Sequence, residues 1–312
     1  MLTNIKKTFS PKPSVIALAS EGRQAKWNIF LNGLAAFGVG IGSIWAEAVI
    51  LMPVIVIKGI LSGGNFMLNG DAGNIASLAA TVMPIIILTL YVKFAEKRSL
   101  RSMGFVKEHA VTDYLLGMVI AFAMFSACVG ICVAAGAMTF GGYVLGNQYV
   151  MLALMFLGFL VQGASEETVC RGFMMTSFGS KGGAFAGMLF NSLVFGALHL
   201  LNSGVTVLSI VNLILFGVFM SALMLKLNSI WMACAIHSVW NFVQGNFFGI
   251  LVSGGSFGVS VFRFNSVEGM ENLNGGAFGM EGGLATTTIL TLAILVVLLL
   301  RPREPKNAAA AA

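Results

Sequence analysis

The sequence predicts an all-α membrane protein, a polytopic bundle of about eight transmembrane helices. Of its 312 residues, 57% are hydrophobic and only 10% are charged, and the mean hydropathy is +0.91. These values exclude an ordinary soluble globular protein. A membrane helix needs roughly 20 mainly apolar residues. The apolar runs that we assign as spans are residues 27–57, 75–92, 114–140, 150–176, 184–201, 205–226, 230–252 and 284–300.

The basic residues predict how this bundle is oriented. Lysine and arginine cluster before the first span, between the second and third spans and after the last, and these three regions lie on one side of an eight-span map. Only Lys58 and Arg263 fall on the other side. By the positive-inside rule, both termini are cytoplasmic. The net charge of +6 is therefore a topology signal. We expect the lipid bilayer as a partner and no nucleic acid.

We expect one membrane domain with two short polar ends. Residues 1–26 are predicted to be a cytoplasmic basic segment without a cleaved leader, and residues 301–312 a cytoplasmic tail. The helix bundle extends over 27–300, with its motif core at 150–252, and the glycine-rich segment 253–283 is predicted to be a flexible external loop. The four cysteines lie in or beside spans, which is typical of reduced thiols. Short loops without appended domains favour a prokaryotic cell membrane.

Charged residues inside one apolar run carry the first functional prediction. A charged side chain near the bilayer centre costs roughly 2.5–3.5 kcal/mol, yet Glu166 and Glu167 stand side by side in the fourth span. Arg171 lies four residues after Glu167 on the same helical face, where the two can form an ion pair. Glu166 points about 100° away. Two carboxylates in unlike environments suit a general base with a structural neighbour. The alternatives are an ion pair without catalytic use, and Cys170 as a nucleophile.

Two further polar pairs lie in later apolar runs. Phe195 and His199 are four residues apart, as are His237 and Asn241, so each pair presents one helical face to the bundle. An isolated membrane histidine is often only hydrogen-bonded to a neighbouring helix. Amide hydrolysis, however, needs an activated water, donors to the oxyanion and a proton for the leaving amine. Glu166 with His199 could activate the water, and His237 with Asn241 could hold the oxyanion.

These three motifs, in this order, resemble those of the CAAX-protease and bacteriocin-processing (CPBP) family of intramembrane proteases, also called the Abi family. The family pattern is Glu-Glu-x-x-x-Arg, then Phe-x-x-x-His, then His-x-x-x-Asn, and the chain matches all three. The resemblance implies an endopeptidase similar to the type II CAAX prenyl endopeptidases, which remove three residues after a prenylated cysteine. It also implies a membrane-associated peptide or protein substrate, prenylated or not. Prokaryotic relatives include proteins linked to bacteriocin immunity.

The resemblance assigns a role to each motif residue. The four catalytic residues that it implies are Glu166 as general base, His199 as its helper at the water, and His237 and Asn241 as the oxyanion site. The three supporting residues that it implies are Glu167, Arg171 and Phe195. No cofactor is firmly implied. The family is often labelled metal-dependent, and Glu166, His199 and His237 are an acceptable zinc set by ligand type, so a zinc enzyme and a metal-free glutamate protease both stay open.

Two other classes of protein compete with the protease. A non-catalytic peptide-binding or bacteriocin-immunity protein would hold a peptide in the same cavity without turnover. A proton-coupled transporter would use buried Glu and His as a proton relay, and inverted repeats, which we do not find, would favour it. Glu47 in the first span either lines such a pathway or makes a polar contact that stabilises the helix.

Overall fold

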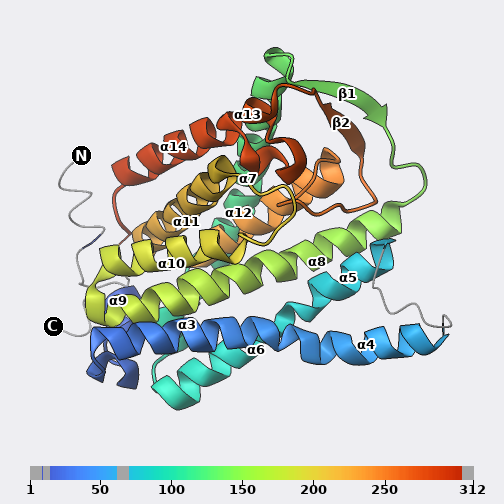
Figure 1. Ribbon diagram of the computed structural model, residues 1–312. Coiled ribbons are helices and arrows are strands. Elements are labelled where there is room, and N and C mark those ends of the chain that lie inside the picture. Colours follow the sequence, from blue (N-terminus) through green and yellow to red (C-terminus); the bar gives the residue numbers. More distant parts are fainter. Residues whose placement is uncertain (1–8, 10–14, 62–69, 304–312) are drawn as a thin grey trace.

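The computed structural model describes residue 9 and residues 15–61 and 70–303. The predicted terminal segments 1–26 and 301–312 therefore lie partly outside the described residues. The described chain is mostly helical, with one two-stranded sheet, and Figure 1 shows a bundle of long helices. This architecture confirms the predicted all-α polytopic fold.

Among the described residues, five helical stretches are long and apolar enough to cross a membrane, and each occupies a predicted span: Ile29–Leu61, Gly70–Glu96, Ala110–Ala134, Tyr149–Gly182 and Val207–Leu227. The other three predicted spans are also helical but shorter. Large apolar side chains face outward, for example Trp45 at 74% and Val207 at 84% exposure. Water would not tolerate so much apolar surface, whereas lipid chains do. The chain is therefore an integral membrane protein.

The described chain contains the following helices and strands in order. Those of the first half are α2 (Val15–Ala19), η1 (Arg23–Lys26), α3 (Ile29–Trp45), α4 (Glu47–Leu61), α5 (Gly70–Ala80), α6 (Val82–Tyr91), η2 (Val92–Glu96), η3 (Leu100–Met103) and α7 (Ala110–Ala134). Those of the second half are β1 (Met138–Tyr143), α8 (Tyr149–Glu167), η4 (Thr168–Met175), α9 (Thr176–Gly182), α10 (Ala184–Leu198), α11 (Val207–Leu227), α12 (Trp231–Phe242), η5 (Val243–Phe247), β2 (Phe262–Ser266), α13 (Glu271–Asn274), η6 (Gly276–Phe278), η7 (Met280–Gly282) and α14 (Leu284–Leu299). Of the η elements, η2, η4 and η5 are π-helical.

The helix α8 is the axis of the bundle. It packs against α12, which in turn packs against α7, while α10 packs against α11 and α11 against α14. In Figure 1, α8 crosses the molecule with α3, α4, α5 and α6 on one side and α10, α11 and α14 on the other. The helices that carry the three motifs, α8, α10 and α12, thus lie in the middle of the bundle.

Two predicted spans end earlier than expected. The third was predicted to reach residue 140, but α7 ends at Ala134. The seventh was predicted to reach residue 252, but its helix ends at Phe247. In both places a glycine follows the last helical turn with a positive φ, +72° at Gly136 and +68° at Gly249. A left-handed glycine at this position terminates a helix.

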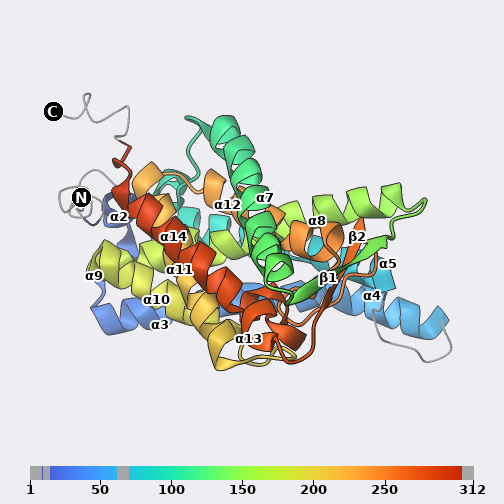
Figure 2. The same cartoon turned by 90° about the horizontal axis from the view of Figure 1, so that it is seen from above.

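The prediction of a flexible loop for residues 253–283 was wrong. The segment contains β2, which pairs antiparallel with β1 (Figure 2), and three short helices. It is tied to the bundle by hydrogen bonds, such as that from Asn274 Nδ2 to the carbonyl of Ala137 at 2.9 Å. Its glycines include Gly275 and Gly279 at positive φ. They therefore serve tight turns in a folded segment, where the sequence pattern had indicated mobility.

The basic segments gather at one end of the bundle. Arg98 donates to Ser177 in α9 at 2.8 Å. Arg303 forms a two-pronged ion pair with Asp113 at the start of α7, at 2.7 and 3.0 Å, and its backbone N–H bonds the carbonyl of Lys226. The connector before α7, the end of α11 and the start of the tail therefore share one side. That this side is cytoplasmic stays a prediction.

Candidate active site

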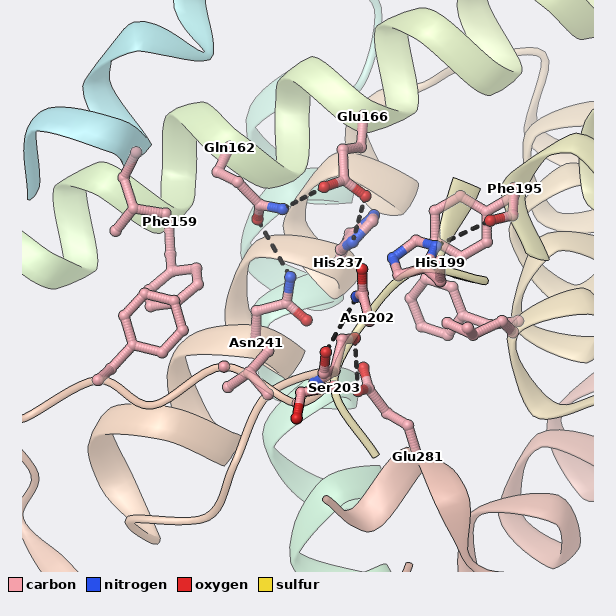
Figure 3. A pocket seen from close by; sticks show the side chains of 18 residues that line it. Phe159, Gln162, Glu166, Phe195, His199, Asn202, Ser203, His237, Asn241 and Glu281 are labelled. Carbon is pink, nitrogen blue, oxygen red and sulfur yellow. Dashed lines mark hydrogen bonds and ion pairs between the residues drawn. The ribbon is translucent and has the colours of Figure 1, made fainter. Parts of the chain in front are cut away.

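A cavity of about 410 Å³ lies between α8, α10, α12 and the segment that follows η5. All four predicted catalytic residues line it: Glu166, His199, His237 and Asn241. Figure 3 shows Glu166 from α8 and His237 from α12 turned toward the same space as His199, which follows α10. The fold thus brings together three motifs that are separated by tens of residues in the sequence.

Glu167 joins the first motif to the third through its buried carboxylate. Its side chain and that of Arg171 are fully buried, and Arg171 Nη1 donates to Glu167 Oε1 at 2.8 Å. Nδ1 of His237 lies 2.7 Å from the same oxygen. A carboxylate only accepts, so Nδ1 carries the proton of this bond. Nε2 of His237 is then turned toward Glu166, 3.5 Å from Oε2. Glu167 therefore orients a histidine in addition to supporting its helix.

The second motif is fixed by the backbone of Phe195. Its carbonyl oxygen lies 2.8 Å from Nδ1 of His199, so Nδ1 again carries the proton and a neutral imidazole has its lone pair on Nε2. The guanidinium of Arg171 lies over the Phe195 ring at 4.7 Å from the ring centre, an arrangement that favours a buried cation. The same ring packs edge-on against His237. Phe195 thus contacts all the other motif helices.

Gln162, which the sequence analysis did not identify, links Asn241 of the third motif to Glu166. Asn241 Nδ2 donates to Gln162 Oε1 at 3.1 Å, and Gln162 Nε2 donates to Glu166 Oε1. Among the described residues, this bond to Gln162 uses one N–H of Asn241 and leaves the second without a recorded acceptor. Gln162 lies one helical turn before Glu166, so the four-residue spacing that identified the other pairs was a usable signal.

Residues 147–243 match the family model described as type II CAAX prenyl endopeptidase Rce1-like. This segment of the chain is similar to the Rce1-like family. The match contains all three motifs and confirms the resemblance predicted from them. No curated protein and no solved structure matches the chain.

Two helices of the matched segment change their geometry at a motif, one within it and one shortly after it. The helix α8 continues into the π-helix η4 after Glu167, and α12 continues into the π-helix η5 shortly after Asn241. Such π segments are rare and often occur at functional sites. Arg171 lies within η4, so the ion pair with Glu167 is formed across the change of helix type.

The wall of the cavity beyond the Rce1-like segment includes a second carboxyl group. Glu281 in η7 is only 8% exposed and lines the cavity together with Asn202, Ser203 and Ser253. Asn202 Nδ2 donates to the carbonyl of Ser253 at 2.9 Å, which joins the turn after His199 to this wall. These residues were missed because Asn202 and Ser203 lie in the turn between α10 and α11, while Ser253 and Glu281 lie in the segment predicted to be a loop.

A second cavity, of about 300 Å³, lies on another side of Glu166. It shares Glu166 and His199 with the first cavity and is also lined by Glu47, at the start of α4, and by Cys170. The Glu166 side chain is 34% exposed, so it contacts open space on more than one side. All four cysteines are buried and free of disulfides.

The residues proposed for a metal do not form a preformed ligand set. Within the described ranges, no group of three or more His, Cys, Asp or Glu side chains is arranged to hold a metal ion. Glu166, His199 and His237 line one cavity without meeting that arrangement.

Proposed function

We propose that the protein is an intramembrane endopeptidase of the CAAX prenyl endopeptidase type, which hydrolyses a peptide bond near the membrane interface. The observation that carries this proposal is the convergence of Glu166, His199, His237 and Asn241 on one cavity. The match to the Rce1-like family supports it. A carboxylate, a basic nitrogen and two amide or imidazole donors are the groups that amide hydrolysis requires.

Water activation would be the task of Glu166 and His199. In the proposed step, a water bound between the Glu166 carboxylate and Nε2 of His199 gives a proton to Glu166 while its oxygen attacks the substrate carbonyl carbon. A positioned base of this kind contributes about 10²–10⁴-fold to the rate. The backbone carbonyl of Phe195 fixes the His199 ring, so Nε2 presents its lone pair to the water.

His237 and Asn241 would stabilise the negative oxygen of the tetrahedral intermediate. The free N–H of Asn241 and an N–H at Nε2 of His237 are the proposed donors. Glu167 holds the other imidazole nitrogen, so the doubly protonated ring is the form of His237 that this step requires. When the intermediate collapses, the carbon–nitrogen bond breaks and the proton on Glu166 passes to the leaving amine. The products are a carboxylic acid and an amine.

The substrate would be a membrane-associated peptide or protein. Much of the cavity wall is apolar and aromatic, including Phe159, Phe216 and Phe257, and such surfaces bind an extended peptide with apolar side chains. Whether the substrate carries a prenyl group is part of the proposal to be tested. Cleavage of synthetic prenylated and unprenylated versions of one peptide gives a direct comparison.

The decisive experiment compares membrane peptides from cells that produce either the wild type or Glu166→Gln. Gln keeps the shape and hydrogen bonding of the side chain but removes the base. We expect new peptide termini with the wild type that are absent with the variant at equal expression. Identical sets of termini would contradict the protease and favour the non-catalytic peptide-binding or immunity protein.

A further inference from the structure

Glu281 is a buried acid in the wall of the cavity, and the proposed hydrolysis does not use it. Its Oε2 accepts hydrogen bonds from the backbone N–H of Ser253 at 2.8 Å and from the Ser253 hydroxyl at 2.7 Å, and lies 3.5 Å from Gln244 Nε2. In Figure 3 it lies on the far side of the cavity from Glu166. One oxygen is thus held by the protein, while the carboxyl group still borders the cavity.

The backbone around Glu281 is specialised for this position. Ser253 has a φ of +46°, an unfavourable conformation for a residue with a side chain. Such conformations persist where the surroundings over-determine them. Gly279 has a φ of +95°, and a Cβ there would collide with the carbonyl oxygen of Leu251. The turn at Ser253 and the chain before η7 therefore approach so closely that they place both Ser253 donors on one carboxyl oxygen.

The charges of the cavity point to the kind of ligand that it accepts. Among the 18 described residues that line it, two are glutamates, Glu166 and Glu281, and none is lysine or arginine. The only lining side chains that can become positive are His199 and His237. A buried carboxylate is costly unless a cation pairs with it.

Burial supports the same reading of Glu281. Burial raises the pKa of the Glu281 carboxyl group, while the nearby His199 and His237 and the bonds from Ser253 oppose this rise. The neutral form is therefore favoured more than in a surface glutamate until a positive group enters. An entering cation restores the charge and gains a desolvated ion pair, whereas an acidic group would meet two carboxyl groups without a lysine or arginine to balance it.

We propose that Glu281 is a specificity-determining residue that pairs with a lysine or arginine side chain of the substrate close to the scissile bond. This inference rests on the proposed peptidase function and names its substrate class. It also implies that an acidic side chain is disfavoured at this wall. If Glu281 were purely structural, it would hold the Ser253 turn, and cleavage would not depend on the charge of the substrate at this position.

The test uses synthetic apolar peptides that carry Lys, Gln or Glu at one position, scanned across the cleavage site. The protein is reconstituted in nanodiscs of zwitterionic lipid, so that the membrane itself does not attract basic peptides. We expect the wild type to cleave the best Lys peptide at least about tenfold faster than its Gln counterpart, since a hydrogen bond between charged groups is worth about that much or more. In Glu281→Gln this ratio should fall to about one, and in Glu281→Lys the Glu peptide should become preferred over the Lys peptide.

The matched control is Glu268→Gln, which removes an exposed carboxylate from the same segment and should keep the wild-type ratio. An unchanged ratio in folded Glu281→Gln, or a wild type that prefers Gln or Glu peptides at every position, would overturn the inference. If Glu281→Gln does not fold, the wild-type ratio alone decides.

A binding measurement separates this inference from the proposed function. The dissociation constants of fluorescent Lys, Gln and Glu peptides are measured for Glu166→Gln, which should not turn them over, and for Glu166→Gln combined with Glu281→Gln. Selective binding of the Lys peptide that is lost in the double variant supports the role of Glu281 even if the wild type cleaves nothing. Equal binding of all three peptides by Glu166→Gln contradicts it even if the wild type is a protease.

Discussion

Nδ1 of His237 lies 2.7 Å from Oε1 of Glu167, the same oxygen that accepts the hydrogen bond from Arg171. One buried atom therefore joins the first motif to the third. The two adjacent glutamates therefore have different surroundings. Glu167 is buried and positions a histidine, while Glu166 faces the cavity. The unlike environments expected for the pair follow from the angle of about 100° between successive helical side chains.

Because Arg171 pairs with this shared oxygen, its loss should lower the stability of the fold. Arg171→Ala leaves Glu167 as a buried carboxylate without its cation, and breaking such a pair costs about 3–5 kcal/mol. We expect a lower unfolding temperature in detergent, reduced expression and lost cleavage together. Arg171→Lys is the matched control, because it keeps the charge. A normal unfolding temperature for Arg171→Ala would show that the ion pair does not stabilise the fold.

Glu166→Gln should separate activity from stability. The variant removes the base from a partly exposed position, so we expect cleavage to fall by at least about 10²-fold, the lower end of the range for a general base. The unfolding temperature should stay near that of the wild type. Both are measured on purified protein with one synthetic peptide. Normal cleavage by this variant would sink the proposed mechanism.

Asn241→Ala should lower kcat without a matching change in KM. If Asn241 donates to the oxyanion, its loss costs about 10²–10³-fold, and the effect appears in the transition state. Gln162→Leu removes only the neighbour that holds Asn241 and Glu166, and we expect a loss of about tenfold, as for one ordinary hydrogen bond. If Asn241→Ala raised KM alone, Asn241 would be a residue for substrate binding.

The four-residue spacing explains why most of the site could be predicted from the sequence. A helix places residues i and i+4 on one face, so Glu167 with Arg171 and His237 with Asn241 were already paired before their helices were placed. Which histidine lies beside Glu166 could not be predicted, because it depends on how α8 and α12 pack. The structure gives a distance of 3.5 Å from Glu166 to His237, whereas the sequence analysis had paired Glu166 with His199.

Glu281 could not be found from the sequence for a different reason. It lies in an irregular segment without apolar periodicity, where neither burial nor partners can be inferred from spacing. Its position depends on backbone turns at Ser253 and Gly279, and on the hydrogen bond that joins Ser253 to Asn202 in the turn after His199. The glycines of this segment indicated mobility, but they permit close approach of backbones instead.

Accessibility labelling should place the two ends of the bundle on opposite sides of the membrane. We expect tags at both termini and in residues 93–113 to be cytoplasmic, because basic residues are retained there. A cysteine introduced in β2, in a variant without the native cysteines, should react from the outside. Labelling of residues 93–113 from the outside would reverse the map and move the turns around the cavity to the cytoplasmic side.

Removal of metal should leave cleavage intact. Glu166 and His199 can activate water without a metal, and Asn241 is a better oxyanion donor than zinc ligand. After stringent chelation and exchange into metal-free buffer, we expect full activity and much less than one equivalent of zinc by elemental analysis. Addition of zinc should not raise the rate. The control is Glu166→Gln, which should stay inactive with and without zinc. Loss of cleavage on chelation, restored by zinc at about one equivalent, would instead make the protein a metalloprotease with Glu166, His199 and His237 as the ligands to test first.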